Sequence, residues 1–231
     1  MIIKPWTPMP TGWILNGYMA ENIGWARNKR LHGSTAISAL MIWITLVTQA
    51  EPLLDDASVR SVDMTYEGLM RATGLSRKLI ADGIAGLREL GFVEVEVVRR
   101  FNRYHISGYV SGSWTKLASR ALYKGDQISA FYSFHKRAAC ELHALMLFVY
   151  YVSIRNRAFG YSMSSFETIH SRTGVSEKKI PLANSFLLNS GLVTNISKEA
   201  SGVSRFREPN KYFLIGNRDL FVGKKAVNPT T

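Results

Sequence analysis

"RATGLSRKLIADGIAGLRELGFVEV", residues 71–95, contains the start and stop signals of two consecutive helices and a strand. Gly74 favours a left-handed cap at the end of the first helix. Ser76 can cap the next helix by accepting a backbone N–H. Gly91 is expected to end that helix before "FVEVEVV", whose alternation is typical of a half-exposed strand.

The same signals recur in "RTGVSEKKIPLANSFLLNSGLV", residues 172–193, with the spacing from the Thr-Gly pair to the second Gly unchanged. Three other landmarks also repeat in the same order. They are Trp6-Thr7-Pro8-Met9 and Trp114-Thr115-Lys116-Leu117, Lys29-Arg30 and Lys136-Arg137, and Ala39-Leu40-Met41 and Ala144-Leu145-Met146. Four matches in the same order and register indicate an internal duplication of one structural unit.

Each copy is predicted to contain helices followed by a hairpin. A strongly apolar helix begins at the repeated Ala-Leu-Met, and a shorter helix follows in "TYEGLMRA" or "SSFETIHSR". In the first copy, the next helix places Ile80, Ile84 and Leu87 on one buried stripe. "FVEVEVV" and "RYHISGY" then form a hairpin, and the second copy returns through "KYFLIG" after a longer turn.

This order of elements is that of a winged helix-turn-helix, whose second helix enters the DNA major groove while the hairpin, or wing, lies along the phosphates. We therefore expect an α+β, mainly helical fold with two tandem winged helix-turn-helix domains. The expected domains are residues 1–110 and 111–217, and residues 218–231 form a basic C-terminal tail.

The second copy departs from the first in its capped helix. Glu177 follows the cap and would repel phosphate. Pro181 lies deep enough to remove a helix hydrogen bond or to force a later start. Asn184 occupies the position of the apolar Ile84. We therefore expect this helix to be shorter, shifted or rotated.

Composition and charge point to a polyanionic partner. The 231 residues include 46% apolar ones, enough for a core, and carry a formal charge of +12. Such a surplus favours nucleic acid over an anionic membrane surface. The winged helix-turn-helix pattern makes double-stranded DNA the expected form. The longest apolar runs are too short to span a bilayer, and the N-terminus lacks a signal pattern. One cysteine, Cys140, fits a reducing compartment, so a cytoplasmic location is expected.

In the first copy, the DNA-facing residues are expected at the start of the capped helix and in the wing. Arg77 is assigned to a base because its planar fork matches guanine, and Lys78 is assigned to phosphate. The wing residues are expected to contact the backbone or the minor groove. The full set is Ser76, Arg77, Lys78, Asp82, Arg99, Arg100, Asn102 and Arg103.

In the second copy, Lys residues after the cap and a basic wing still favour DNA despite Glu177. This set is Ser176, Lys178, Lys179, Lys198, Arg205, Arg207 and Lys211. The difference between the sets suggests a division of labour, in which the first copy reads bases and the second grips the backbone.

The residue patterns argue against catalysis and against a metal site. His135, Cys140 and His143 have a spacing that does not collect three ligands on one helical face. The chain shows no phosphate-binding Gly-rich loop with the required Lys, no His-x-His pair for DNA nicking and no Ser-His-Asp set. We expect no enzyme activity, no cofactor and no metal.

Two winged helices in tandem, each opened by a Trp-containing strand, resemble the replication initiator proteins of plasmids and some phages. The resemblance covers residues 6–216 and rests on "WTPMP" and "WTKLA", "TGLSRK" and "TGVSEK", and "NRYHISGY" and "NKYFLIG". It implies binding to repeated origin sites, pairing of protomers, and recruitment of host replication proteins. By analogy Arg77, Lys78 and the wings would meet the DNA.

Two other readings stay open. A transcriptional regulator of a mobile element could use the two copies as an internal dimer on neighbouring major-groove faces. A protein-interaction adaptor would use the same folds to bind proteins, and it would show no salt-dependent duplex binding.

Overall fold

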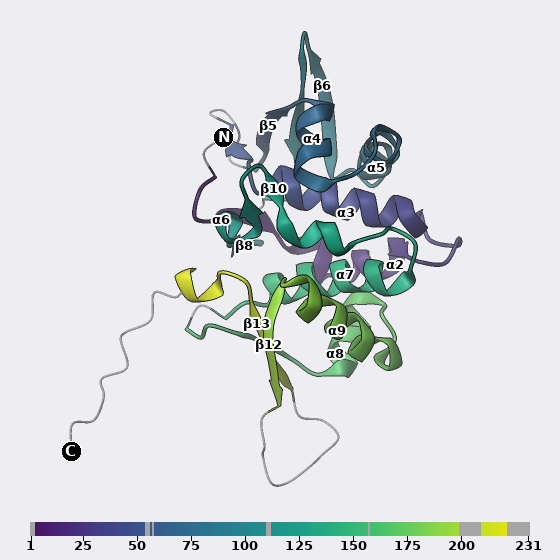
Figure 1. The fold of residues 1–231 in the computed structure, drawn as a ribbon, viewed down its shortest axis with the longest axis vertical. Coiled ribbons are helices and arrows are strands. Elements are labelled where there is room, and N and C mark those ends of the chain that lie inside the picture. The colour runs from purple at the N-terminus through teal and green to yellow at the C-terminus, as the bar shows by residue number, and fades with distance from the viewer. Residues whose placement is uncertain are drawn as a thin grey trace, which may run out of the picture.

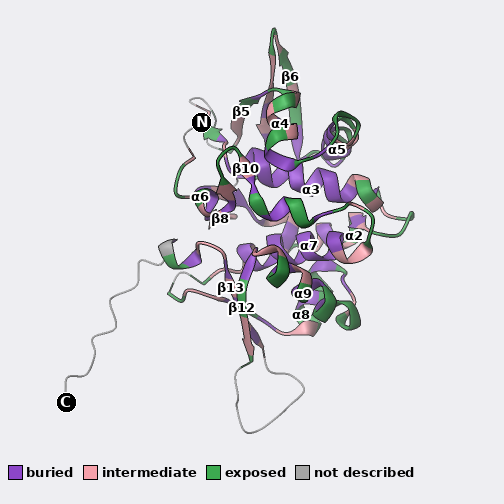
Figure 2. Ribbon diagram, in the orientation of Figure 1, coloured by how far each residue is buried: buried purple, intermediate pink, exposed green. Residues whose placement is uncertain are grey.

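A computed structural model of the chain describes residues 3–53, 56, 58–109, 112–156, 158–198 and 209–220. Two long helices, α3 (Gly33–Val47) and α7 (Ala139–Ser153), lie beside each other at the centre (Figure 1). Every residue from 36 to 47 and from 141 to 152 is buried (Figure 2). These helices are apolar on all sides because other elements cover every face.

The first half of the chain supplies most of the upper part of Figure 1, around α3, although residues 12–22 pack against elements of the second half. Its four-stranded antiparallel sheet has the order β4-β5-β7-β6. Besides α3, its elements are β1 (Thr7–Pro10), α1 (Gly12–Leu15), α2 (Tyr18–Asn22), β2 (Ile23–Gly24), β3 (Leu31–His32), β4 (Glu51–Pro52), β5 (Arg60–Met64), α4 (Tyr66–Thr73), α5 (Arg77–Glu89), β6 (Val93–Val98) and β7 (Phe101–Ile106).

The second half supplies most of the lower part, around α7, although residues 127–128 pack against α4 in the upper part. Its three-stranded sheet has the order β11-β13-β12. Besides α7, its elements are β8 (Trp114–Leu117), α6 (Ser119–Leu122), β9 (Tyr123–Lys124), β10 (Gln127–Ile128), η1 (Ser129–Ser133), β11 (Ser162–Ser164), α8 (Phe166–Thr173), η2 (Glu177–Lys179), α9 (Ile180–Ser190), β12 (Val193–Lys198), β13 (Asn210–Leu214) and η3 (Asn217–Leu220). The fold is α+β, with about 47% helix and 24% strand.

The turn between the two shorter helices is built from the same contacts in both halves. Gly74 ends α4 with φ 68°, and Gly174 ends α8 with φ 73°. Thr73 donates to the carbonyl four residues earlier (2.6 Å) and accepts from the amide two residues later (3.2 Å). Thr173 makes both bonds, at 2.7 and 3.2 Å. The predicted glycine caps are therefore present in both halves.

The strands β1 and β8 pair with a register that is two-fold symmetric. Pro8 lies opposite Lys116, and Thr7 and Met9 lie opposite Leu117 and Thr115. Because Trp6-Thr7-Pro8-Met9 matches Trp114-Thr115-Lys116-Leu117 in sequence, exchanging the strands reproduces the pairing. A local two-fold axis therefore passes through this pair. The hairpins β6–β7 and β12–β13 point in opposite directions from the centre (Figure 1).

The expected domains 1–110 and 111–217 share one hydrophobic core. Polar contacts also cross between them. The hydroxyl of Tyr123 lies 2.9 Å from both Thr48 Oγ1 and Gln49 Nε2, and the amide of Thr11 donates to the carbonyl of Ser113 (2.8 Å). Residues 218–220 of the expected tail continue η3, and residues 221–231 lie outside the described part of the chain.

The capped helix of the second half is shortened but not rotated. A 3₁₀ turn occupies residues 177–179, and α9 begins only at Ile180, with Pro181 in its first turn. Asn184 stays buried at the position of Ile84. The hydroxyl of Tyr151 donates to its Oδ1 at 2.8 Å, and this bond removes the cost of burying an amide. The expected later start is confirmed, and rotation was the wrong alternative.

The helices α3 and α5 approach closely because α5 carries glycine at the contact. A Cβ added to Gly83 would lie 3.1 Å from the backbone N of Ala39 and 2.6 Å from Ile42 Cδ1. At Gly86 the nearest atom would be Leu31 Cδ1 at 2.5 Å, which is the end of a side chain and can move. A side chain at residue 83 would therefore be harder to accommodate than one at residue 86.

We predict that Gly83→Ala lowers the free energy of unfolding by about 1–3 kcal/mol, since overpacking outweighs the better helix propensity of alanine. Gly86→Ala is the matched control and should cost less, because Leu31 can adjust. Urea unfolding of both variants measures the difference. Equal stability of Gly83→Ala and the unmodified protein would contradict the close contact.

Candidate nucleic-acid interface

The N-terminus of α5 presents two exposed cations. Ser76 caps the helix by accepting from the amide of Leu79 (3.4 Å), as expected. Arg77 and Lys78 follow in the first turn and are exposed, and Asp82 is half-buried one turn later. The helix dipole and the cations both favour an anion at this end.

The tip of the first hairpin consists of two arginines. Val98 pairs with Phe101, so Arg99 and Arg100 alone connect β6 to β7, and both are exposed. Arg99 has φ 49°, in the left-handed region that glycine or asparagine usually occupies in such loops. The loop therefore carries an arginine at position 99, where the backbone conformation favours glycine or asparagine.

A groove of about 530 Å³ joins these two features. The Arg77 guanidinium carbon lies 5.3 Å from the ring centroid of Tyr66, at the start of α4, and this contact holds the side chain in the groove. The groove contains three guanidinium groups and one carboxylate. It is lined by Thr65, Tyr66, Glu67, Arg77, Arg99, Arg100, Phe101 and Asn102.

The other two predicted hairpin residues lie on β7, away from the tip. Arg103 makes a two-pronged ion pair with Asp63 on β5 (2.7 and 3.0 Å), and Glu96 on β6 lies 4.0 Å away. The bonds from Arg103 lower the pKa of Asp63, and the carboxylate raises the pKa of Arg103. Asn102 lines the groove and also donates to the hydroxyl of Tyr104 (3.3 Å). Arg103 is thus paired with carboxylates on the two neighbouring strands of its own sheet.

In the second half, the predicted residues are spread over several elements. Ser176 precedes η2 but makes no side-chain cap bond, so the expectation that it caps like Ser76 was wrong. Its backbone carbonyl accepts from the amide of Lys179 (2.8 Å) instead, in the tighter 3₁₀ turn. Lys178 and Lys179 are exposed in η2, and Lys198 is exposed at the end of β12. Lys211 is half-buried on β13 with its Nζ 5.1 Å from the centroid of Tyr161. Arg205 and Arg207 lie outside the described residues.

The exposed side of α9 differs from that of α5 in charge. Its exposed residues are uncharged, and Leu182 has 62% of its surface accessible. Sequence reasoning missed this face because it searched for cations, although the run "PLANSFLLN" contains the signal. The exposed residues are Pro181, Leu182, Ser185, Leu188 and Asn189.

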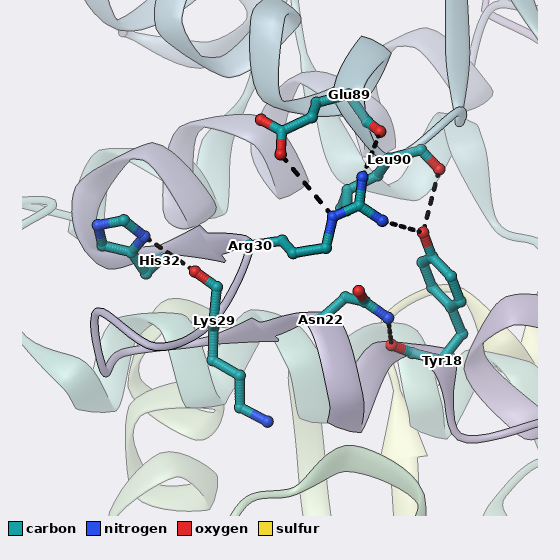
Figure 3. A network of polar contacts seen from close by, with 7 residues as sticks. All are labelled: Tyr18, Asn22, Lys29, Arg30, His32, Glu89 and Leu90. Atoms are coloured by element: carbon teal, nitrogen blue, oxygen red, sulfur yellow. Dashed lines mark hydrogen bonds and ion pairs between the residues drawn. The ribbon is translucent and has the colours of Figure 1, made fainter.

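Arg30, from the repeated Lys29-Arg30 pair, contacts the C-terminal end of α5 (Figure 3). Arg30 donates to the carbonyl of Glu89 (2.9 Å) and to the hydroxyl of Tyr18 (3.4 Å). That hydroxyl donates to the carbonyl of Leu90 (3.4 Å). A cation at a helix C-terminus is favourable, so Arg30 stabilises the end of α5. Lys29 Nζ donates to the carbonyl of Ala20 (2.6 Å).

The second Lys-Arg pair uses its backbone instead. The amides of Lys136 and Arg137 donate to the buried carboxylate of Glu141 at 3.1 and 2.7 Å. This carboxylate also accepts from Ala138 (2.9 Å), in the first turn of α7. The repeated dipeptide therefore performs two different structural tasks.

His143 is buried on α7 and lies close enough to Lys179, in the 3₁₀ turn η2, to feel its charge. Burial of the imidazole, followed by the nearby Lys179 charge, lowers the pKa of His143 from 6.5 to about 4. Between these values the unfolded chain binds more protons than the folded protein. Stability that is present above pH 6.5 is therefore lost as the pH falls toward the folded pKa.

We predict that lowering the pH from about 7 to about 5 costs about 1–2 kcal/mol of stability through His143. Urea unfolding at the two pH values measures this loss. His143→Gln should remove that part of the pH dependence, because glutamine does not titrate. An unchanged pH dependence in the variant would show that other groups cause it.

We predict that Arg99→Asn leaves the free energy of unfolding unchanged or raises it by up to about 1 kcal/mol, because asparagine tolerates positive φ better. Arg100→Asn is the control, since Arg100 is outside the left-handed region. If the tip holds DNA, both variants weaken duplex binding while only the first gains stability. A large loss of stability in Arg99→Asn would refute the strained loop.

Within the described ranges, no three His, Cys, Asp or Glu side chains cluster so as to hold a metal ion. The helices in those ranges also lack the combination of length and apolarity needed to cross a bilayer. Comparisons with protein-family models, with curated proteins and with solved structures find no match to this chain.

Proposed function

We propose that the chain is an internally duplicated pair of winged helix-turn-helix units that binds double-stranded DNA. The repeated order of strand, helix, helix and hairpin after each central helix supports this reading. The two-fold register of β1 with β8 and the repeated threonine contacts support the duplication. The formal charge of +12 fits a polyanionic partner.

The groove between α4, α5 and the first hairpin is the observation that carries the proposal. Its three arginines converge from two elements that a winged helix places beside the DNA backbone. Arg77 lies in this groove over Tyr66, so we now assign it to phosphate together with Arg99 and Arg100. Guanidinium groups bind phosphate in two-pronged fashion, and such contacts position the protein on the duplex.

Base reading then falls to the exposed residues further along α5. Ala81 and Ala85 are small and exposed, so the helix can approach base edges closely. Lys78 can donate to guanine, and Asp82 can accept from the amino group of cytosine. These assignments replace the expectation that Arg77 reads a base.

The uncharged face of α9 supports base reading by the second unit as well. Ser185 and Asn189 can form hydrogen bonds with base edges, and Leu182 can contact the methyl group of thymine. Lys178 and Lys179 stand before the helix and are assigned to phosphate. We therefore replace the expected division of labour with base reading in both units.

A plasmid or phage replication initiator that binds repeated origin sites remains our preferred role, from the tandem architecture. The two-fold arrangement also supports a transcriptional regulator in which one chain imitates a dimer. Selection of bound duplexes from a random pool separates the roles. Long direct repeats favour the initiator, a palindrome favours the regulator, and no selected motif favours the adaptor.

We predict that Arg77→Ala, Arg99→Ala and Arg100→Ala each weaken binding to all duplexes and reduce the salt dependence, by about 0.9 in slope for each lost phosphate contact. Arg103→Ala is the matched control and should keep the slope, because Arg103 is paired with Asp63. Fluorescence anisotropy at several salt concentrations measures both quantities. Equal slopes for all four variants would contradict the groove as the DNA contact.

A further inference from the structure

The outer face of the β11-β13-β12 sheet carries an aromatic cluster on the protein surface. Phe159 and Tyr161 are stacked, with ring centroids 5.3 Å apart and planes 13° from parallel. Phe213 on β13 lies 5.5 Å from Tyr161. Half of the surface of Phe159 and 48% of that of Met163 are exposed. We call Phe159, Tyr161, Met163, Lys211 and Phe213 the aromatic face.

The inner face of the same sheet already supplies the core of this half. Tyr212 is fully buried and stacks on Tyr151 of α7 with centroids 3.8 Å apart. Because side chains alternate along a strand, the residues on either side of Tyr212 point outward. The aromatic face is thus separate from the core that Tyr212 and Tyr151 form.

The first half shows what the same position looks like as an ordinary solvated surface. Across its three strands, Asp63, Arg103 and Glu96 lie in one row. The matching row of the second half is Met163, Lys211 and Ser197. The formal charge of the row changes from negative to positive, because Asp63 and Glu96 are replaced by Met163 and Ser197.

The occupant that fits this surface is a single-stranded nucleic acid. Flat aromatic side chains stack on bases, and nearby cations contact the phosphates. Lys211 lies over Tyr161, so cation and ring are adjacent. The described residues of the face include this ammonium and no carboxylate, which is complementary to a polyanion.

We propose that the aromatic face binds single-stranded DNA by base stacking, separately from the duplex site. This inference rests on the proposed function for the class of partner, and it adds a second form of that partner. Stacking is tolerant of sequence, so the face would hold an unpaired strand rather than select one.

Binding of the full-length protein to fluorescent oligothymidylate and to a duplex tests the proposal. Phe159→Ala and Tyr161→Leu remove the flat rings, and the leucine keeps most of the apolar bulk. Tyr132→Ala is the matched control, since Tyr132 is 63% exposed on η1, outside the aromatic face. Thermal melting checks that each variant is folded.

We expect each face variant to weaken oligothymidylate binding about tenfold or more, with duplex binding and the control unchanged. The ratio of wild-type to variant affinity should persist at higher salt, because stacking is not ionic. Oligothymidylate binding that is unaffected by both face variants would overturn the proposal. So would an equal loss for duplex and single strand.

The two proposals fail in different ways. A wild-type protein that binds duplex but not oligothymidylate overturns the aromatic face and leaves the proposed function standing. A wild-type protein that binds oligothymidylate through the face but not duplex overturns the proposed function and leaves the aromatic face standing.

Discussion

The packing of α3 against α7 is the constraint on which the rest of the structure depends. Both helices are buried along nearly their whole length, so neither half can complete its core without the other. The β1–β8 pair joins the halves with a two-fold register. A shared close-packed core resists relative movement, so the spacing of α5 and α9 is set by the fold. The molecule presents two similar units at a fixed separation.

Within this frame the two halves share several local contacts and differ in surface chemistry. The threonine-glycine turn occurs in both. Each half also has an asparagine that donates to the tyrosine two residues later, on β7 at 3.3 Å and on β13 at 3.4 Å. The first half then surrounds a groove with arginines and covers its sheet with ion pairs. The second half exposes an uncharged helix and an aromatic sheet. The shared contacts therefore fix the backbone of each half, and the side chains that differ between the halves decide what each surface can contact.

Local signals predicted much of the fold. Ser76 and Gly74 marked helix boundaries, and Pro181 delayed α9 as expected, because caps and proline act within a few residues. Pairing between distant residues was not predictable in this way. Asp63, forty positions from Arg103, neutralises a cation that sequence alone assigned to DNA. Tyr151 keeps Asn184 buried through a bond that only the tertiary fold creates.

The most direct test of the account is a hydroxyl-radical footprint of the intact chain on a duplex that it selects. Two units held rigidly by α3 and α7 should protect two windows on one face of the DNA, separated by about one helical turn. A single window, or protection whose spacing varies from site to site, would contradict the rigid pair. Absence of any protection with folded protein would remove DNA as the partner.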